Sequence, residues 1–400
     1  MPINTKPIFF ILTLLLSLYT LRLVGPLSVA DFGAMLFIFI SLLKFRSVVI
    51  NDFNVVFLVW VLVSLISSLG LIYEDYFTVT GFLGTGLRIL VSMALLLCLP
   101  LWLKSKEEQF QAIGALLSIV IFHSIVQLVF VALFYLNKAP FLNLVPHGDQ
   151  SSRQEWLNVY DYTFYTRFGG VFEEPSWYSW FMVACIGLII SFEIVNRVSI
   201  ITKRKWLLIL SALFFTYSIA GIASIVILIA YKILSGSIRA KIRSVVFISI
   251  ALPALILLNP DSALLKRLMG VFSGTDGSSN TRIFDSFTKL KLVLENNMTG
   301  TGIGNSIEGI YHYDVTNSFT VISTQNGFIE AFVSTGLIGG AIFMVPFVYF
   351  LCVKKYWLSL ITMTLVFFTT SALFIVVMWF FMALAYLLFK DLKINLQPST

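Results

Sequence analysis

A series of apolar runs, most of them about 15 to 20 residues long, recurs from one end of this 400-residue chain to the other. Runs of this length match the helix needed to cross the hydrocarbon core of a bilayer. Hydrophobic residues make up 58% of the sequence and charged residues only 12%, about half the charged share of a soluble domain. In lipid every backbone polar group must be satisfied within the segment, which favours helices. The sequence therefore predicts an all-α polytopic membrane protein.

Basic residues between the apolar runs indicate which ends face the cytoplasm. They gather in short loops, for example Lys44 to Arg46, Lys104 to Lys106 and Lys203 to Lys205. Loops rich in Lys and Arg stay on the cytoplasmic side of a membrane. This distribution accounts for the net charge of +7 without a nucleic-acid partner. It also places both chain termini in the cytoplasm.

Two apolar segments, residues 206–234 and 356–389, have basic residues at both ends. A single helix would put one basic end outside, so we expect each segment to form a hairpin of two short helices. The breaks are expected near Thr216–Gly221 and near Thr369–Ser371. With eight further spans the total is about twelve transmembrane helices. The eight are expected at about residues 7–24, 29–43, 55–70, 85–103, 110–136, 177–195, 244–258 and 337–352.

Two polar segments, residues 137–176 and 259–321, are much longer than a simple connection between helices. The orientation above places both on the outer face. Loops this long are usually functional or disordered, and the aromatic residues of the first loop favour order. No internal repeat divides the chain, so we expect residues 1–400 to form a single membrane domain.

The most distinctive polar stretch, Arg167 to Ser176, lies where the first outer loop returns to the membrane. Pro175 suits the first turn of a helix, and Glu173 and Glu174 would lie beside the positive end of that helix. Arg282 in the second loop and Arg88 near the outer end of a span add two cations. Guanidinium groups stay charged and donate paired hydrogen bonds. The three arginines predict an anionic ligand such as a lipid diphosphate.

The second loop contains two further patterns. Residues 282–295 read as an amphipathic helix that lies on the outer leaflet, caps a groove or packs over the bundle. Its apolar face would hold Ile283, Phe284, Phe287, Leu290 and Leu294. The glycines of Gly300 to Asn305 could bring backbone N–H groups close to a phosphate, although such a sequence is more often a turn.

Metal and disulfide chemistry have no support in the sequence. The three cysteines are far apart and lie in apolar segments. Neither outer loop contains an Asp-x-Asp pair or a His/Glu cluster at metal-binding spacing. We therefore expect no metal and no cofactor.

Several of these elements together resemble a known family. The stretch Arg167 to Ser176, Arg282 ahead of Gly300 to Asn305, and Gln325 to Glu330 followed by Gly336 to Gly339 are similar, in that order, to motifs of bacterial O-antigen polymerases (Wzy type). O-antigen ligases share the superfamily, in which a break like that at Thr216–Gly221 also occurs. The resemblance covers more than the C-terminal half of the chain.

The resemblance implies an inner-membrane, metal-independent glycosyltransferase of the C class, with two large periplasmic loops. Its substrates would be oligosaccharide repeat units on undecaprenyl diphosphate, which it joins at the periplasmic face, and a chain-length regulator protein is a further expected partner. Arg167 and Arg282 would stabilise the departing diphosphate, and Glu173 and Glu174 are further catalytic candidates. We expect the substrate-binding residues to be Arg88, Gly302, His312, Asn326 and Glu330.

The catalytic base stays open at this point. Ligases carry His-Asn where this chain has Gln325-Asn326, so the base candidates are Glu173, Glu174, Glu330 and His312. Each has a structural alternative, such as pairing with Arg167, capping a helix, holding a loop or facing solvent. The rival functions are an O-antigen ligase, which transfers finished polysaccharide to lipid A core, and a lipid-linked oligosaccharide flippase. A flippase usually has two similar halves, which this chain lacks.

Overall fold

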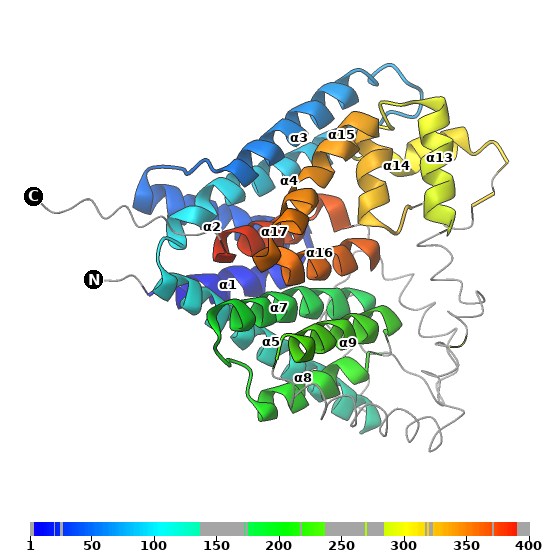
Figure 1. Ribbon diagram of the computed structural model, residues 1–400. Coiled ribbons are helices and arrows are strands. Elements are labelled where there is room, and N and C mark those ends of the chain that lie inside the picture. Colours follow the sequence, from blue (N-terminus) through cyan, green and yellow to red (C-terminus); the bar gives the residue numbers. More distant parts are fainter. Residues whose placement is uncertain are drawn as a thin grey trace, which may run out of the picture.

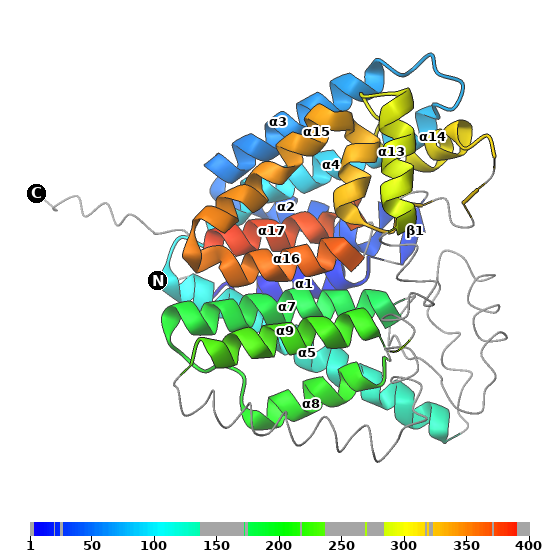
Figure 2. The same ribbon diagram turned by 45° about the vertical axis from the view of Figure 1, so that its right-hand side comes forward.

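The computed structural model describes residues 4–19, 21–24, 27–136, 172, 175–216, 218–236, 269, 284–316, 318–319, 323–369 and 372–389. These residues form a mostly helical bundle in which the longer helices lie side by side (Figures 1 and 2). The helices are α1 (Lys6–Ser17), α2 (Val29–Phe45), α3 (Asp52–Leu69), α4 (Val79–Cys98), α5 (Lys106–Tyr135), α7 (Pro175–Asn196), α8 (Lys203–Phe214), α9 (Ile219–Leu234), α13 (Ser286–Asn296), α14 (Ser306–Tyr313), α15 (Gly327–Cys352), α16 (Trp357–Thr369) and α17 (Val376–Phe389).

Among the described residues, five helical segments are long and apolar enough to cross a membrane, which is the pattern of a polytopic membrane protein. They are Asp52–Leu69, Val79–Trp102, Lys106–Leu133, Ser176–Asn196 and Gly327–Cys352, and shorter apolar helices lie at Lys6–Ser17, Ala220–Leu234 and Val376–Phe389. The total of about twelve spans stays a prediction, because the span expected at 244–258, most of the first long loop and part of the second lie outside the described residues.

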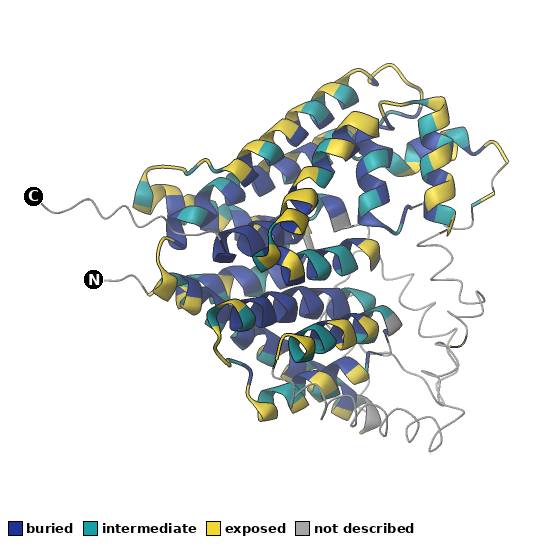
Figure 3. Cartoon of the chain, viewed as in Figure 1, coloured by how far each residue is buried: buried dark blue, intermediate teal, exposed yellow. Residues whose placement is uncertain are grey.

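Burial in the bundle follows the pattern of a protein surrounded by lipid (Figure 3). Every residue of α17 is buried, so this helix lies at the centre of the bundle. Large apolar side chains on the outer helices are exposed, such as Phe39 on α2 at 59% and Ile66 on α3 at 68%. A soluble protein rarely exposes so much apolar surface, whereas lipid tails cover it in a membrane.

Contacts between distant segments place the basic loops at one end of the bundle. The Lys44 Nζ atom lies 4.4 Å from the centre of the Trp102 ring, which joins the end of α2 to the segment after α4. At the same end, Gln109 near the start of α5 donates to the Leu387 carbonyl at the end of α17, at 3.2 Å. The helices therefore alternate in direction as the positions of the basic residues predict.

Both predicted hairpins are confirmed as pairs of helices with breaks at the expected places. Helix α8 ends at Phe214 and α9 begins at Ile219, and the chain reverses between them (Figures 1 and 2). Helix α16 ends at Thr369, and α17 begins at Val376 after a 3-10 turn. The Tyr356 hydroxyl, just before α16, donates to the Tyr386 carbonyl near the end of α17 at 3.2 Å.

The first predicted span, residues 7–24, is wrong in its extent, because α1 ends at Ser17. The chain continues as strand β1 (Arg22–Val24), which pairs antiparallel with β2 (Leu27–Ser28). Gly25-Pro26, a dipeptide typical of turns, lies between the two strands in the sequence. Residues 22–24 thus belong to a short strand pair, and the description "all-α" needs this small exception.

Helix α15 has a kink that divides it into two helical pieces. Gly336 has φ 69° and ψ −171°, a backbone conformation that is essentially restricted to glycine. The kink lies directly before the predicted membrane span at about residues 337–352 and after the Gln325–Glu330 motif. The loop that follows α13 packs into this kink.

Candidate functional site

Four of the predicted site residues, Arg167, Glu173, Glu174 and Arg282, lie outside the described residues, so their roles stay predictions. The other five, Arg88, Gly302, His312, Asn326 and Glu330, are described. All five lie away from the bundle end that carries the basic loops. They belong to three neighbouring features: an ion pair between α2 and α4, the loop at the α15 kink, and the start of α15 with helix α14.

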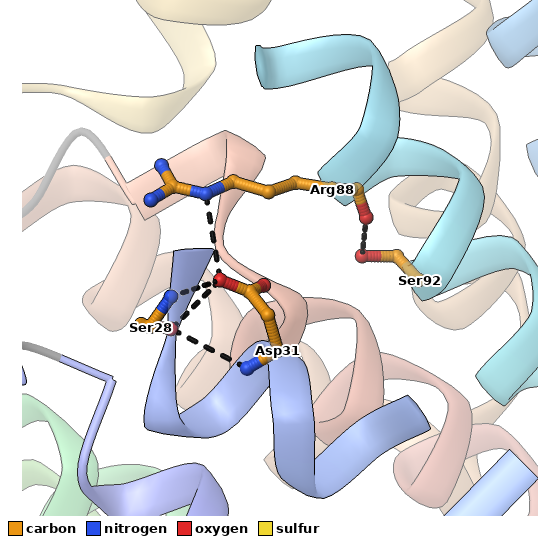
Figure 4. Close-up of polar contacts among 4 residues, drawn as sticks. All are labelled: Ser28, Asp31, Arg88 and Ser92. Atoms are coloured by element: carbon orange, nitrogen blue, oxygen red, sulfur yellow. Dashed lines mark hydrogen bonds and ion pairs between the residues drawn. The ribbon is translucent and has the colours of Figure 1, made fainter. Parts of the chain in front are cut away.

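The ion pair joins Arg88 of α4 to Asp31 of α2 (Figure 4). The Arg88 Nε atom lies 3.5 Å from Oδ2 of Asp31, whose side chain is 3% exposed. Asp31 is fixed by a capping box, because its Oδ2 also accepts from the Ser28 backbone N–H at 2.7 Å and from the Ser28 hydroxyl at 2.8 Å. The start of α2 therefore holds a buried carboxylate beside the arginine.

Asp31 is a residue that the sequence analysis missed. The signal was present as Ser28-Val-Ala-Asp31, a Ser followed three residues later by an acid just before an apolar run. That pattern marks the helix start correctly. It does not show that the acid faces an arginine on another helix, since the contact depends on how α2 and α4 pack.

The glycine-rich loop is bound to the protein's own backbone. The N–H groups of Thr301 and Gly302 donate to the carbonyls of Val333 at 2.8 Å and Ser334 at 3.0 Å, just before the α15 kink. The Leu337 N–H, just after the kink, donates to the Met298 carbonyl at 3.0 Å. The kink frees these groups from the helix, and the loop satisfies them. In this arrangement Gly302 secures the kink.

The next residues of this loop fix the start of α4. Asn305 is fully buried, and its Oδ1 accepts from the Thr78 N–H at 2.7 Å and from the Thr78 hydroxyl at 2.6 Å. Gly304 lies so close to Gly81 that a Cβ atom on Gly304 would be 2.2 Å from the Gly81 carbonyl oxygen. The loop thus joins α4 to α15, and both glycines are required by close backbone approach.

Asn326 and Glu330 organise the first turns of α15. The Asn326 Oδ1 accepts from the backbone N–H groups of Phe328 and Ile329, so Asn326 is the N-cap of the helix. Glu330 is 6% exposed and accepts three hydroxyl hydrogen bonds. The donors are Ser306 at 2.7 Å, Ser334 at 2.9 Å and Thr324 at 2.5 Å. This geometry holds the segment before α15 against α14.

Gln325 precedes the cap with a backbone φ of 54°. A non-glycine residue with positive φ is uncommon, and such strain tends to occur at functional positions. The Gln325 Nε2 atom donates to the Ser323 hydroxyl at 2.8 Å. The residue therefore occupies a defined place just before the start of α15.

His312 lies at the end of α14 and is exposed. Its ring centre is 5.2 Å from that of Tyr76, in the connection between α3 and α4. The Tyr313 hydroxyl donates to the Tyr76 hydroxyl at 3.3 Å. Of the two described base candidates, His312 is open to the outside and Glu330 is enclosed.

Helix α13 buries a face that differs from the predicted apolar one, although Leu290 of that predicted face packs against the buried Val293. Its buried residues are Ser286, Lys289 and Val293, whereas Phe284 and Phe287 are 67% and 54% exposed. The polar residues are buried because they reach carbonyls of the segment before α15. Ser286 donates to the Thr324 carbonyl, and Lys289 Nζ donates to the Ser323 carbonyl at 3.0 Å.

Lys289 is buried although its side chain carries a cation. Burial lowers the pKa of Lys289 below its ordinary value, although Asp285 and Asp314 act in the opposite direction. Burial raises the pKa of Asp314, but hydrogen bonds from Ser318, Phe319 and Thr316 outweigh this effect and leave that pKa below the usual range. Lys289 also lies over the Phe319 ring, with Nζ 5.0 Å from its centre.

A small pocket lies between α7, α9 and α16. Its lining includes Ser176 and Trp180 of α7 together with Gly221 and Ser224 of α9. Ser176 immediately follows Pro175, so the pocket adjoins the end of the Arg167–Ser176 stretch. Within the described ranges, no three His, Cys, Asp or Glu side chains are grouped so that they could hold a metal ion.

Comparison with known proteins adds one finding. The model of a family described as O-Antigen ligase matches residues 206–344, from the start of the first helical hairpin to the middle of α15. The chain therefore carries an O-antigen ligase family domain, consistent with the O-antigen polymerase and ligase superfamily. The matched part contains four of the five described candidates, all except Arg88. No curated protein matches the chain.

Proposed function

We propose that this protein polymerises oligosaccharide repeat units carried on undecaprenyl diphosphate, at the periplasmic face of the bacterial inner membrane. The family domain supports a polymerase or ligase type of glycosyl transfer. The observation that favours the polymerase is Gln325, because ligases carry a histidine at this position before the asparagine. Here the side chain at the strained position donates a hydrogen bond to Ser323 and has no titratable group.

In the proposed reaction, a sugar hydroxyl of one lipid-linked unit attacks the anomeric carbon of the chain on another. The new glycosidic C–O bond forms as the C–O bond to the diphosphate breaks, and undecaprenyl diphosphate leaves with the electron pair. Arg167 and Arg282 stabilise the negative charge that develops on the diphosphate. No metal takes part, and both lipids are held in one site, which lowers the entropic cost of the encounter.

The hydroxyl proton passes to a base on the outer face. Glu173 and Glu174 keep this role in the proposal, together with His312, which is exposed at the end of α14. Glu330 is better suited to hold the start of α15 in place than to act as the base, since its two oxygens already accept three hydroxyl hydrogen bonds in a buried position. Its partners fix the start of α15, where Gln325 and Asn326 lie.

The proposed topology has about twelve spans in one glycosyltransferase C-like membrane domain, with both termini in the cytoplasm. The two outer loops, residues 137–176 and 259–321, then face the periplasm. The partners are the lipid-linked oligosaccharides, membrane lipid and a protein that regulates chain length. The basic end of the bundle, with Lys44 beside Trp102, supports this orientation.

An O-antigen ligase is the second candidate, and the description of the matching family favours it. A ligase would use the same donor but transfer it to lipid A core. The polymerase and the ligase can be distinguished by running surface polysaccharide on a gel, taken from cells depleted of the wild-type protein. With Arg167→Ala or Arg282→Ala at normal protein level, we expect the long ladder to collapse to core plus a single repeat unit.

The matched control is Arg204→Ala at the exposed, basic start of α8, which should leave the ladder intact. Bare core without any repeat unit would instead indicate a ligase or a flippase. An unchanged ladder in both variants would remove Arg167 and Arg282 from the site.

A further inference from the structure

An apolar groove lies between α2 and α4, away from the glycine-rich loop and the start of α15. Helix α2 lines it with Met35, Ile38, Phe39 and Leu42. Helix α4 contributes Leu90, Val91 and Ala94. The groove is open on one side. Phe39, Leu42 and Leu90 are 59%, 43% and 54% exposed, so in a membrane this side faces hydrocarbon.

The two lines of side chains that form the groove end at the ion pair of Figure 4. On α2, Asp31 precedes Met35 by four residues, and on α4, Arg88 precedes Val91 by three. Residues at these spacings share one face of a helix. The Nε atom of Arg88 and the Oδ2 atom of Asp31, 3.5 Å apart, therefore lie at the outer end of the groove.

The charge of Asp31 is stabilised mainly by its own helix. Its bonds to Ser28 are 2.7 and 2.8 Å long, and the first turn of a helix favours an anion. The contact with Arg88 is longer, at 3.5 Å, than a good charge-assisted hydrogen bond of about 2.7–2.9 Å. The Arg88 side chain is also 25% exposed. Asp31 therefore fixes the position of the Arg88 guanidinium at the end of the groove.

The depth of Arg88 indicates which lipid fits. Along α4, Arg88 lies about 21 Å from Trp102 at the basic end, and the helix continues about 13 Å beyond Arg88 toward the outer face. A phosphate on Arg88 would lie deeper than the headgroup layer that surrounds a hydrocarbon core of about 30 Å. An ordinary phospholipid would have to leave that layer, whereas a lipid drawn into an enzyme site would be held at this depth.

We propose that the α2–α4 groove binds the hydrocarbon chain of the polyprenyl diphosphate substrate, with the diphosphate directed toward Arg88 and with Asp31 as the residue that positions Arg88. This inference rests on the proposed function for the identity of the lipid. It places the lipid chain in the N-terminal part of the molecule, outside the matched family domain at residues 206–344.

The kinetic test uses purified protein in nanodiscs and lipid-linked repeat units with either the full polyprenyl chain or one shortened to a few isoprene units. Ala94→Trp fills the groove. It should raise KM for the full-length substrate about fivefold and leave KM for the short one unchanged. A lipid chain that moves from the membrane into the groove stays in an apolar environment, so it gains only packing contacts with the groove, and the tryptophan removes them. Ala132→Trp, at an exposed position on α5, is the matched control. Equal effects of Ala94→Trp on both substrates would overturn the groove.

A second measurement does not depend on turnover. A photoreactive polyprenyl diphosphate should label residues 35–42 and 90–94, and excess polyprenyl diphosphate should suppress the labelling while phosphatidylglycerol should not. Equal competition by phosphatidylglycerol, or no label in these segments, would contradict the proposal. If the groove is labelled in a protein that forms no polymer, the proposed function is wrong and the lipid-binding groove is retained. If the protein forms polymer but these segments are not labelled, the proposed function is retained and the lipid-binding groove is wrong.

Discussion

Replacing Gly336 by alanine tests how tightly the glycine-rich loop is fixed at the kink of α15. The φ of 69° and ψ of −171° at this position cost a non-glycine residue about 1–3 kcal/mol. An added Cβ would also lie 2.4 Å from the Met298 carbonyl oxygen and from the Thr299 carbonyl carbon. Both are backbone atoms, so the loop itself must move.

The size of the effect depends on the hydrogen bonds that the loop loses. Three backbone bonds cross the kink, from Thr301 to Val333, from Gly302 to Ser334 and from Leu337 to Met298. Each is worth about 1 kcal/mol net. With strain of about 2 kcal/mol, Gly336→Ala should lower the free energy of unfolding by about 2 kcal/mol if the bonds survive and by about 5 kcal/mol if all three break.

The assay is a denaturant titration of purified protein in mixed micelles, followed by tryptophan fluorescence. Gly86→Ala is the matched control, because no atom lies within 4 Å of a Cβ added there. Gly86 is inside α4, where alanine is the better helix former, so this variant should be as stable as wild type or slightly more stable. A Gly336→Ala protein within about 0.5 kcal/mol of wild type would refute the reasoning.

Gly300→Ala extends the test, since a Cβ on Gly300 would lie 2.5 Å from the Gly336 nitrogen. The two substitutions disturb one contact. The double variant should therefore lose less stability than the sum of the single variants. Simple additivity would mean that the loop and the kink are not coupled.

Three further substitutions address the charged residues. Asp31→Asn should lower the free energy of unfolding by only about 1–2 kcal/mol, because the partly exposed Arg88 limits the contribution of the ion pair. In a double-mutant cycle, adding Arg88→Gln should lower the free energy of unfolding little further. Glu330→Ala should lower the free energy of unfolding by about 2–3 kcal/mol, because it leaves hydroxyl donors unpaired. Glu330→Gln should keep both the fold and polymer formation. Loss of polymer formation in a folded Glu330→Gln protein would identify Glu330 as the catalytic base. Burial lowers the pKa of Lys289 in the folded protein, so the unfolded chain holds the Lys289 proton more tightly. The free energy of unfolding should therefore rise as the pH approaches 10.5, the ordinary pKa of a lysine. Lys289→Met should reduce this pH dependence.

Much of the fold follows from the sequence because the rules involved are local. The breaks after Phe214 and after Thr369 were expected from basic residues at both ends of each apolar segment, and that argument needs no knowledge of packing. The extent of α1 was wrong because an apolar run does not distinguish a helix end from a short hairpin.

The site was harder to predict because its contacts join distant residues. In α13 the predicted apolar residue Phe287 is exposed, whereas Lys289 is buried because it reaches the Ser323 carbonyl. Similarly, Gly302 suggested a phosphate cradle, yet its N–H is bonded to Ser334. The motif pattern names candidate residues, while the partner of each residue depends on tertiary structure.

The most direct test of the central proposal uses purified protein in nanodiscs with lipid-linked repeat units as the only sugar substrate. The account predicts polysaccharide of many repeat units, with one undecaprenyl diphosphate released for each bond formed. Loss of both products in Arg167→Ala and Arg282→Ala, but not in Arg204→Ala, would complete the result. A protein that forms no polymer and transfers saccharide only after lipid A core is added would contradict the account and identify a ligase.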